Sequence, residues 1–315
     1  MRVAVYGAGA VGAYLGSRFA AGRADVHLIA RGAHLAALRE RGLTLVTPDG
    51  VTTTQVWATD DPASIGPVDL VLFCVKSYDT EAVAARLAPL IGPSTAVLSI
   101  QNGVDNEPKI AAAIGAEHVL GAAVYVLAAV ESPGVVRSGP ARVVVGELVP
   151  GPPSRRVSEI VEVARAGGLD ATAVPDVRLA KWEKYTVLVA FSAVSAATQL
   201  PLGDVRRAPA ALAMLRGLMT EAWTVGRALG VPLADDLVSR QVELLLAQAD
   251  SAGASLRHDL MTGHRMELEA LQGTLSRLGR ETRVPTPWTD AAYAILQPWA
   301  FRNEGAAGDR PTTPG

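Results

Sequence analysis

Cysteine is almost absent from this 315-residue chain, which contains only Cys74 and therefore cannot form an intrachain disulfide. A lone thiol fits a reducing compartment. No apolar run reaches the ~18 residues that a membrane-spanning helix requires, and the first residues lead straight into a predicted strand rather than a secretory signal. These absences predict a cytoplasmic protein with no membrane partner.

Charge of one sign and aromatic side chains are also scarce. The 29 basic and 31 acidic residues leave a formal net charge of −2, which favours neither nucleic acid nor an anionic membrane surface as a partner. Aromatic residues make up 5% of the chain, too few for a surface that stacks bases. His258 and His264 lack further ligands at metal-binding spacing, so no metal site is predicted.

The first dozen residues contain a glycine-rich motif. Residues 2–6 are typical of a buried strand and residues 13–20 of a helix. The segment between them matches G-x-G-x-x-G and consists of Gly7, Ala8, Gly9, Ala10, Val11 and Gly12. In this context the first glycine makes a tight turn, the second lets a pyrophosphate approach the backbone, and the third lets the helix pack on the strand. The helix N-terminus attracts the phosphates. The alternative is a strand–turn–helix corner without a ligand.

The end of the second predicted strand, residues 24–30, indicates which dinucleotide binds. A cofactor without a 2′-phosphate favours an acidic residue there, which binds the ribose hydroxyls. Here the strand is followed by Arg31, whose planar guanidinium can hold a phosphate through two hydrogen bonds and stack on adenine. The sequence therefore favours NADPH over NADH, and a solvated surface arginine is the alternative.

Two later predicted strands, residues 68–75 and 95–100, are followed by polar residues. Lys76 follows the first strand, and Asn102 follows the second. Ligands bind at the carboxyl ends of parallel strands in doubly wound sheets, so we expect both residues at the cofactor site. Asn102 has a donor and an acceptor with which it could bridge cofactor and substrate. Its alternative role is to make a simple Asn-Gly turn.

The pattern of elements changes near residue 176. Strands and helices alternate before that point, which predicts an α/β domain with a mostly parallel, doubly wound sheet of the Rossmann type. The periodicity is helical beyond it, over residues 178–198, 209–229, 233–249, 255–261, 265–278 and 287–299. We predict an NADP-binding domain (1–176), an all-α substrate and catalytic domain (177–301) and a disordered tail (302–315) without an apolar anchor.

Lys184 is the candidate for chemistry in the helical half. It opens the apolar run 185–195, and Ser192 and Ser195 lie within ~80° of it on one helical face. A desolvated lysine has a lowered pKa and can serve as a general acid, and Ser192 could contact the substrate. The alternative is a snorkelling lysine near the helix start.

Ser255 and Glu267 flank a predicted break in the helical pattern. On one straight helix they would lie ~18 Å apart. Gly263 between them predicts a helix end, which could fold the two residues toward one site. Glu267 would then lie in the first turn of the next helix, where a carboxylate is favourable. Alternatively, Glu267 has a purely structural role as a favourable negative charge at the start of a helix.

Taken together, these motifs resemble the ketopantoate reductase (2-dehydropantoate 2-reductase) family over nearly the whole chain. The resemblance depends on the order and spacing of the glycine-rich segment 7–12, Arg31, residues 74–76, 101–103 and 182–184, and the group Ser255, Asp259 and Glu267. It implies NADPH-dependent reduction of a 2-oxo acid, in particular of 2-dehydropantoate to pantoate in pantothenate biosynthesis.

The resemblance also implies roles for single residues. Lys184 corresponds to the general acid, and Glu267 to an acidic residue near cofactor and substrate. Ser255 corresponds to a residue that binds the substrate carboxylate. The residues implied to touch NADPH or substrate are Arg31, Lys76 and Asn102.

Four positions depart from the biosynthetic pattern. Asparagines expected in the family are replaced by Leu188, Ser192, Leu202 and Ala252. Each lost amide removes hydrogen-bonding capacity toward the substrate, and such losses weaken recognition of a polar substrate. Two alternatives stay open: a reductase for a bulkier, apolar oxo acid or imine, and an NADPH-binding sensor without turnover. A homodimer is possible through apolar helices such as residues 210–228.

Overall fold

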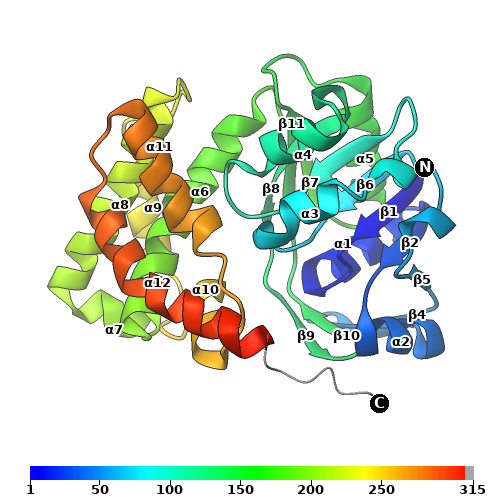
Figure 1. The fold of residues 1–315 in the computed structure, drawn as a ribbon, viewed down its shortest axis with the longest axis horizontal. Helices are drawn as coiled ribbons and strands as arrows, with labels where there is room; N and C mark the ends of the chain where they lie inside the picture. Colours follow the sequence, from blue (N-terminus) through cyan, green and yellow to red (C-terminus); the bar gives the residue numbers. More distant parts are fainter. Residues whose placement is uncertain (309–315) are drawn as a thin grey trace. The chain divides into compact units, whose positions relative to one another are not determined.

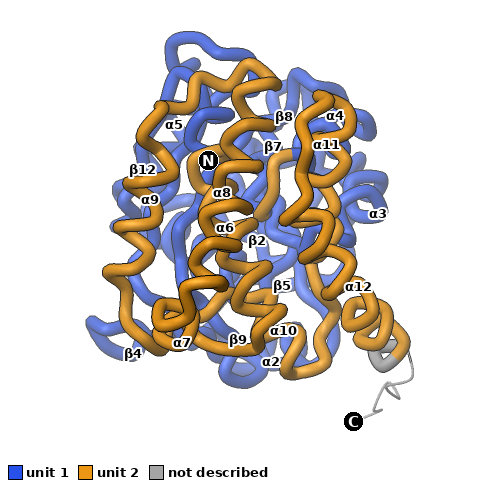
Figure 2. Tube along the Cα trace, turned by 90° about the vertical axis from the view of Figure 1, so that its left-hand side faces the viewer, with its two compact units in different colours: residues 1–101, 105–180 blue, residues 102–104, 181–315 orange. Residues whose placement is uncertain are grey.

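The structure of the protein is a computed structural model, and it describes residues 1–308. The chain divides into two compact units, which Figure 2 distinguishes by colour. The first unit comprises residues 1–101 and 105–180. The second comprises residues 102–104 and the chain from Lys181 onward.

A parallel sheet forms the centre of the first unit. Its order is β12-β11-β8-β7-β6-β1-β2-β5, and within the described chain only the β11–β8 pair is antiparallel. The chain runs from β1 outward to β2 and then returns to β6 on the other side of β1, so the order reverses beside β1. The strands are β1 (Arg2–Tyr6), β2 (Asp25–Ile29), β5 (Trp57–Thr59), β6 (Leu70–Phe73), β7 (Ala96–Ser99), β8 (Val119–Tyr125), β11 (Arg142–Glu147) and β12 (Asp170–Ala173).

Helices cover both faces of this sheet (Figure 1). Alternate residues of β1 point to opposite faces: Val3 and Val5 join a buried core with α1 and α5, whereas Ala4 and Tyr6 join a second core with α3 and α4. A strand buried on both sides is expected to be continuously apolar. The predicted doubly wound α/β fold is confirmed. The helices of this unit are α1 (Ala10–Ala21), α2 (Gly32–Arg41), α3 (Thr80–Ala84), α4 (Asn106–Ile114) and α5 (Arg155–Ala166).

A second, smaller sheet belongs to the same unit, with the order β4-β3-β10-β9. Its first hairpin consists of β3 (Leu43–Thr47) and β4 (Gly50–Thr54), which pair antiparallel. The sequence analysis missed the second hairpin, β9 (Ala128–Ser132) and β10 (Val135–Ser138), and also α4. Because β10 pairs in parallel with β3, from a distant part of the chain, its partner could not be inferred from local pattern.

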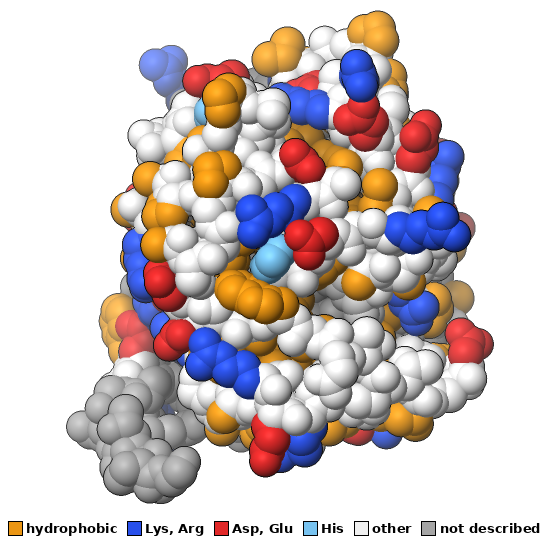
Figure 3. All heavy atoms as spheres, turned by 90° about the vertical axis from the view of Figure 1, so that its right-hand side faces the viewer, with side chains coloured by type: hydrophobic (Ala, Val, Ile, Leu, Met, Phe, Trp, Pro, Cys, Tyr) orange, Lys and Arg blue, Asp and Glu red, His pale blue; other side chains and the backbone are white. Residues whose placement is uncertain are grey.

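The surface of the molecule carries charges of both signs. On the face shown in Figure 3, acidic and basic side chains are interspersed rather than gathered by sign. Ion pairs in the first unit join Arg39 to Asp60 at 3.4 Å and Arg155 to Glu159 at 2.6 Å. A mixed surface of this kind creates little long-range field for a polyanion.

The second unit is helical, as predicted. Helix α8 packs against α7, α9, α11 and α12, and Leu215, Leu218 and Met219 of α8 are fully buried in the shared core. No helix within residues 1–308 is long and apolar enough to cross a membrane. The helices are α6 (Val177–Thr198), α7 (Leu202–Arg207), α8 (Pro209–Ala228), α9 (Leu237–Leu246), α10 (Ser255–Thr262), a π-helix (Glu269–Gly273), α11 (Thr274–Thr282) and α12 (Pro287–Gly308).

Two predictions about the second unit need correction. Helix α12 continues to Gly308, so the prediction of a disordered tail is wrong for residues 302–308. The anchor is polar: Asn303 is 4% exposed, and its amide nitrogen donates to the carbonyl oxygens of Asp259 (3.2 Å) and His264 (2.8 Å). The tail prediction for residues 309–315 lies outside the described residues. The helix expected from residue 265 begins only at Glu269, with a π-helical turn.

Candidate active site

The glycine-rich turn follows β1, beside the point where the strand order reverses. Gly7 has φ +91°, a conformation that disfavours other residues, and a Cβ atom there would lie 2.8 Å from Val75 Cγ1. A Cβ atom at Gly12 would lie 2.3 Å from the carbonyl oxygen of Gly7. The fold itself therefore requires glycine at these two positions, for the turn and for the close packing of α1 on the sheet.

Gly9 differs from both. It is exposed, its φ is −74°, and a Cβ atom there would meet no heavy atom of the described chain within 4 Å. Gly9 is the N-cap of α1, and the first turn contains no acidic residue. Ala10 and Val11 begin the helix, and the amide of Ala8 is bonded to Ile29 O at 2.9 Å. The turn thus leaves open space in front of the helix N-terminus, as a dinucleotide pyrophosphate requires.

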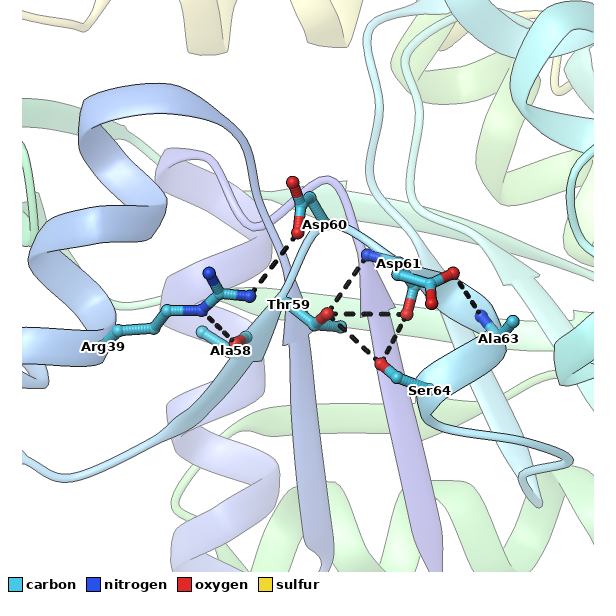
Figure 4. A network of polar contacts seen from close by, with 7 residues as sticks. All are labelled: Arg39, Ala58, Thr59, Asp60, Asp61, Ala63 and Ser64. Atoms are coloured by element: carbon cyan, nitrogen blue, oxygen red, sulfur yellow. Dashed lines mark hydrogen bonds and ion pairs between the residues drawn. The ribbon is translucent and has the colours of Figure 1, made fainter.

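Arg31 lies at the N-cap of α2, directly after β2, and its side chain is 89% exposed. Its guanidinium lies 4.0 Å from Asp79 Oδ2. The backbone beside it is fixed, because Ala30 N donates to Thr59 O at 3.0 Å. Figure 4 shows the polar network that holds the end of β5. It consists of Arg39, Ala58, Thr59, Asp60, Asp61, Ala63 and Ser64.

Lys76 is exposed and lies at the carboxyl end of β6, where it begins a short 3₁₀ turn. Asn102 comes shortly after β7 and packs with the second unit. Its side-chain oxygen Oδ1 accepts a hydrogen bond of 2.7 Å from Lys184 Nζ of α6. The structure thus joins two residues that are 82 positions apart in the sequence and that were predicted separately.

The amine of Lys184 lies in an environment that disfavours its charge. Burial, and after it the positive charge of Lys181, lower the pKa of Lys184 from 10.5 to about 8, while Glu267 acts in the opposite direction. Glu267 is buried, with 7% exposure. A lysine with such a pKa is mostly protonated at neutral pH and is a much better acid than a solvated one.

Two hydrogen bonds fix the segment after Glu267 against α6. The hydroxyl of Tyr185 donates to Leu271 O at 2.6 Å, and the amide of Gln272 donates to Val189 O at 2.8 Å. Both residues are buried, with exposed fractions of 1% for Tyr185 and 0% for Gln272. Leu271 O, which lies in the π-helical turn, accepts both from this hydroxyl and from the backbone N–H of Thr274. Glu267 is thereby held near Lys184.

The two serines of the predicted site lie in different surroundings. Ser192 is fully buried, and its hydroxyl has no hydrogen-bond partner among residues 1–308. Ser255 is exposed and is the first residue of α10. Gly263 ends that helix in the left-handed conformation, φ 69°, as predicted. The structure therefore brings together Lys184, Asn102 and Glu267, but encloses the hydroxyl of Ser192 in the helical core.

The sequence analysis missed Lys181, whose charge acts on the Lys184 amine, and Gln272, which bonds the segment after Glu267 to α6. Gln272 carries no pattern that distinguishes it from a surface glutamine. Lys181 could have been noticed from the sequence, because lysine is rare in this chain, which has four lysines and 25 arginines. Two of these four lysines lie one helical turn apart, at positions 181 and 184.

The chain is similar to known proteins along nearly its whole length. The family described as ketopantoate reductase PanE/ApbA matches residues 3–150, and the family described as its C-terminal part matches residues 176–300. The chain belongs to the ketopantoate reductase family. A 2-dehydropantoate 2-reductase of Halobacterium salinarum is 34% identical over 91% of this chain and 95% of its own length. One of Mesorhizobium japonicum is 32% identical over 94% of this chain and 97% of its own length.

Solved structures of the ketopantoate reductase family have the same fold. A PanE/ApbA family ketopantoate reductase from Ralstonia eutropha superposes with a TM-score of 0.89 at 34% identity, covering 96% of this chain and 100% of that one. A D-mandelate dehydrogenase solved with NADH and anilino(oxo)acetate has a TM-score of 0.88 at 20% identity, over 96% of this chain and 100% of that one. At that identity the likeness shows a common fold.

Proposed function

We propose that the protein uses NADPH to reduce a 2-oxo acid to a 2-hydroxy acid, and that the acid is 2-dehydropantoate or a close analogue. The observation that supports this most directly is the partly buried Lys184, bonded to Asn102 and facing the charge of Glu267. Such a cluster can supply a proton to an oxygen that becomes negatively charged during reduction.

In this proposal the first domain, residues 1–176, holds the cofactor. The open space at Gly9 and the free end of α1 receive the pyrophosphate, and Arg31 binds the 2′-phosphate. Lys76 and Asn102 contribute at the carboxyl ends of β6 and β7. When bound, NADPH supplies the hydride that reduces the 2-oxo carbon.

The second domain, residues 177–301, supplies the proton and binds the acid. Lys184 donates its proton to the carbonyl oxygen and neutralises the charge that develops there. Glu267 stabilises the ammonium group, so that Lys184 stays protonated at neutral pH despite its burial. Asn102 orients the amine, and Ser255 binds the substrate carboxylate. The hydroxyl of Ser192 is fully buried, so this proposal gives it no contact with the substrate.

Replacement of Lys184 by alanine tests this mechanism. Loss of a general acid lowers turnover ~10²–10⁴-fold, and we expect NADPH binding to change little, because the residues assigned to the cofactor stay intact. NADPH oxidation with 2-dehydropantoate measures turnover, and fluorescence titration measures binding. The matched control is Lys109→Ala, which removes a lysine of α4 paired with Asp105. Retained activity in Lys184→Ala would refute the mechanism.

A bulkier, apolar 2-oxo acid or imine is the second candidate substrate. Two of the four positions that lack the family's asparagine, Leu202 and Ala252, are in contact with each other. Leu202 is fully buried, and its backbone N–H donates to Ala252 O at 2.9 Å. Rates with 2-dehydropantoate and with a panel of apolar 2-oxo acids and imines distinguish the candidates. Tight NADPH binding without oxidation by any of these compounds would indicate a sensor instead.

Two further proposals concern the cell and the assembly. The single cysteine, which fits a reducing compartment, supports the proposal of a cytoplasmic location. A homodimer is a separate proposal, which analytical sedimentation can test. Helix α8 already buries much of its apolar surface within its own unit.

A further inference from the structure

The side chain of Gln101 ties together the ends of two neighbouring strands that carry residues of the proposed site. Gln101 follows β7, directly precedes Asn102 in the chain, and is 6% exposed. Its Nε2 donates to Val75 O at 3.0 Å, and Val75 directly precedes Lys76. The same nitrogen donates to Thr80 Oγ1, at the start of α3, at 2.7 Å. One buried amide therefore joins the segment that carries Lys76 to the segment that carries Asn102.

This connection lies beyond the paired part of the two strands. The register of β6 with β7 ends at Phe73 and Ser99. Val75 lies two residues past that end, and the bond to its carbonyl comes from a side chain. Val75 also packs on the glycine-rich turn, since a Cβ atom at Gly7 would lie 2.8 Å from Val75 Cγ1. The peptide that Gln101 holds is therefore in contact with the turn assigned to the pyrophosphate.

The orientation of the Gln101 amide follows from its partners. A backbone carbonyl can only accept, so the atom that faces Val75 O is the nitrogen. The hydroxyl of Thr80, 1% exposed, accepts from that nitrogen and donates its own proton to Ser77 O at 2.8 Å, with Asn106 Oδ1 the more distant acceptor at 3.2 Å. Oε1 of Gln101 is buried and has no hydrogen-bond partner among residues 1–308. The side chain thus acts within the described chain through the two bonds that it donates.

We propose that Gln101 is a positioning residue that fixes the backbone before Asn102, so that Asn102 Oδ1 stays in place to accept from the Lys184 amine. The inference rests on the proposed function, in which Lys184 is the proton donor. The bond from Lys184 Nζ to Asn102 Oδ1 measures 2.7 Å. Hydrogen bonds weaken steeply when their geometry departs from the ideal, so a backbone left unfixed at Gln101 weakens this one. Gln101 acts through Asn102 and does not touch the reacting atoms.

The direction of the effect on Lys184 follows from the chemistry of the bond. An oxygen that accepts from the amine stabilises its protonated form. Loss of that acceptor therefore favours the neutral amine and lowers the pKa of Lys184. Because a neutral amine cannot protonate a carbonyl oxygen, the fraction of competent enzyme falls.

The test measures the proton on Lys184 directly. Lysine labelled with ¹³C at Cε gives four resonances, one for each lysine of the chain, and Lys184→Arg identifies the one that belongs to Lys184. In Asn102→Ala we expect the titration midpoint to move down by roughly one pH unit, the effect of losing a hydrogen bond to a charged group. In Gln101→Met, which keeps the length of the side chain, we expect at least roughly half of that shift. Gln101→Leu provides a second variant if the first does not fold.

A double variant decides whether the effect passes through Asn102. Gln101→Met should move the midpoint in the wild-type background but not in the Asn102→Ala background, whereas independent effects would add. Lys181 and Glu267, whose charges act on the same amine, are unchanged in all of these variants.

Thr95→Val is the matched structural control. The hydroxyl of Thr95, 2% exposed, donates to Val68 O and so ties the other, amino-terminal ends of β6 and β7. Its loss removes a buried bond between the same two strands, so it should lower resistance to denaturant without moving the midpoint of Lys184. The proposal is overturned by an unmoved midpoint in both Gln101 variants, by an unmoved midpoint in Asn102→Ala, or by an equal further fall in the double variant.

The same variants distinguish this inference from the proposed function. If the midpoint falls as expected and kcat for NADPH oxidation at a pH of about 8 falls roughly 2–5-fold with it, both are supported. If the midpoint falls but wild type reduces no oxo acid or imine, the role of Gln101 stands and the proposed reaction fails. If wild type is active and the midpoint does not respond to Gln101, the reaction stands and the role of Gln101 fails.

Discussion

Gly9→Ala is the change that most sharply separates cofactor binding from folding. Its backbone, φ −74° and ψ −154°, lies outside the left-handed region, and the new methyl group would meet no heavy atom of residues 1–308 within 4 Å. Replacement of glycine by alanine at a compatible position stabilises by ~0.4–1 kcal/mol, because it restricts the unfolded chain. We therefore expect a free energy of unfolding within about 1 kcal/mol of wild type.

The same methyl group would occupy the space that the pyrophosphate needs. Overpacking by one carbon costs ~1–3 kcal/mol, so the Kd for NADPH should rise roughly 5–150-fold. Denaturant unfolding measures the first quantity, and fluorescence titration with NADPH measures the second. Gly12→Ala is the contrasting variant: its methyl group would lie 2.3 Å from Gly7 O, so the protein itself should be destabilised. Unchanged NADPH affinity in Gly9→Ala would refute the assignment of this turn.

Three further predictions concern pH, cofactor choice and stability. Because the pKa of Lys184 is about 8 and reduction needs its protonated form, kcat/KM for reduction should fall as the pH rises through about 8. Arg31→Ala should weaken NADPH binding ~10–100-fold, the loss of charge-assisted hydrogen bonds, and leave NADH binding nearly unchanged in titrations with both cofactors. The carboxylate of Glu221, 7% exposed, accepts from Trp288 N at 2.8 Å, Thr289 N at 2.9 Å and Thr289 Oγ1 at 2.6 Å. Glu221→Ala should therefore lower the free energy of unfolding by ~3 kcal/mol in denaturant titrations.

Elements whose pattern is local were predictable. The strand predicted before the glycine turn is β1, Arg2–Tyr6, and the helix expected over residues 209–229 is α8, Pro209–Ala228. Helix ends that depend on tertiary contacts were not: Asn303 anchors the last turns of α12 through two distant carbonyl groups. The π-helical turn at Glu269 also has a distant contact, since the hydroxyl of Tyr185 of α6 donates to Leu271 O within it.

By itself, the sequence determined the doubly wound sheet followed by helices, the glycine turn and the residues that are candidates for chemistry. It could do so because hydrophobic periodicity and glycine act within a few residues. Only the tertiary structure decided that Asn102 bonds Lys184, that Lys181 and Glu267 act on the same amine, and that Ser192 is enclosed. Hydrogen bonds and electrostatic interactions depend on distance in space, and the order of residues along a chain does not fix that distance.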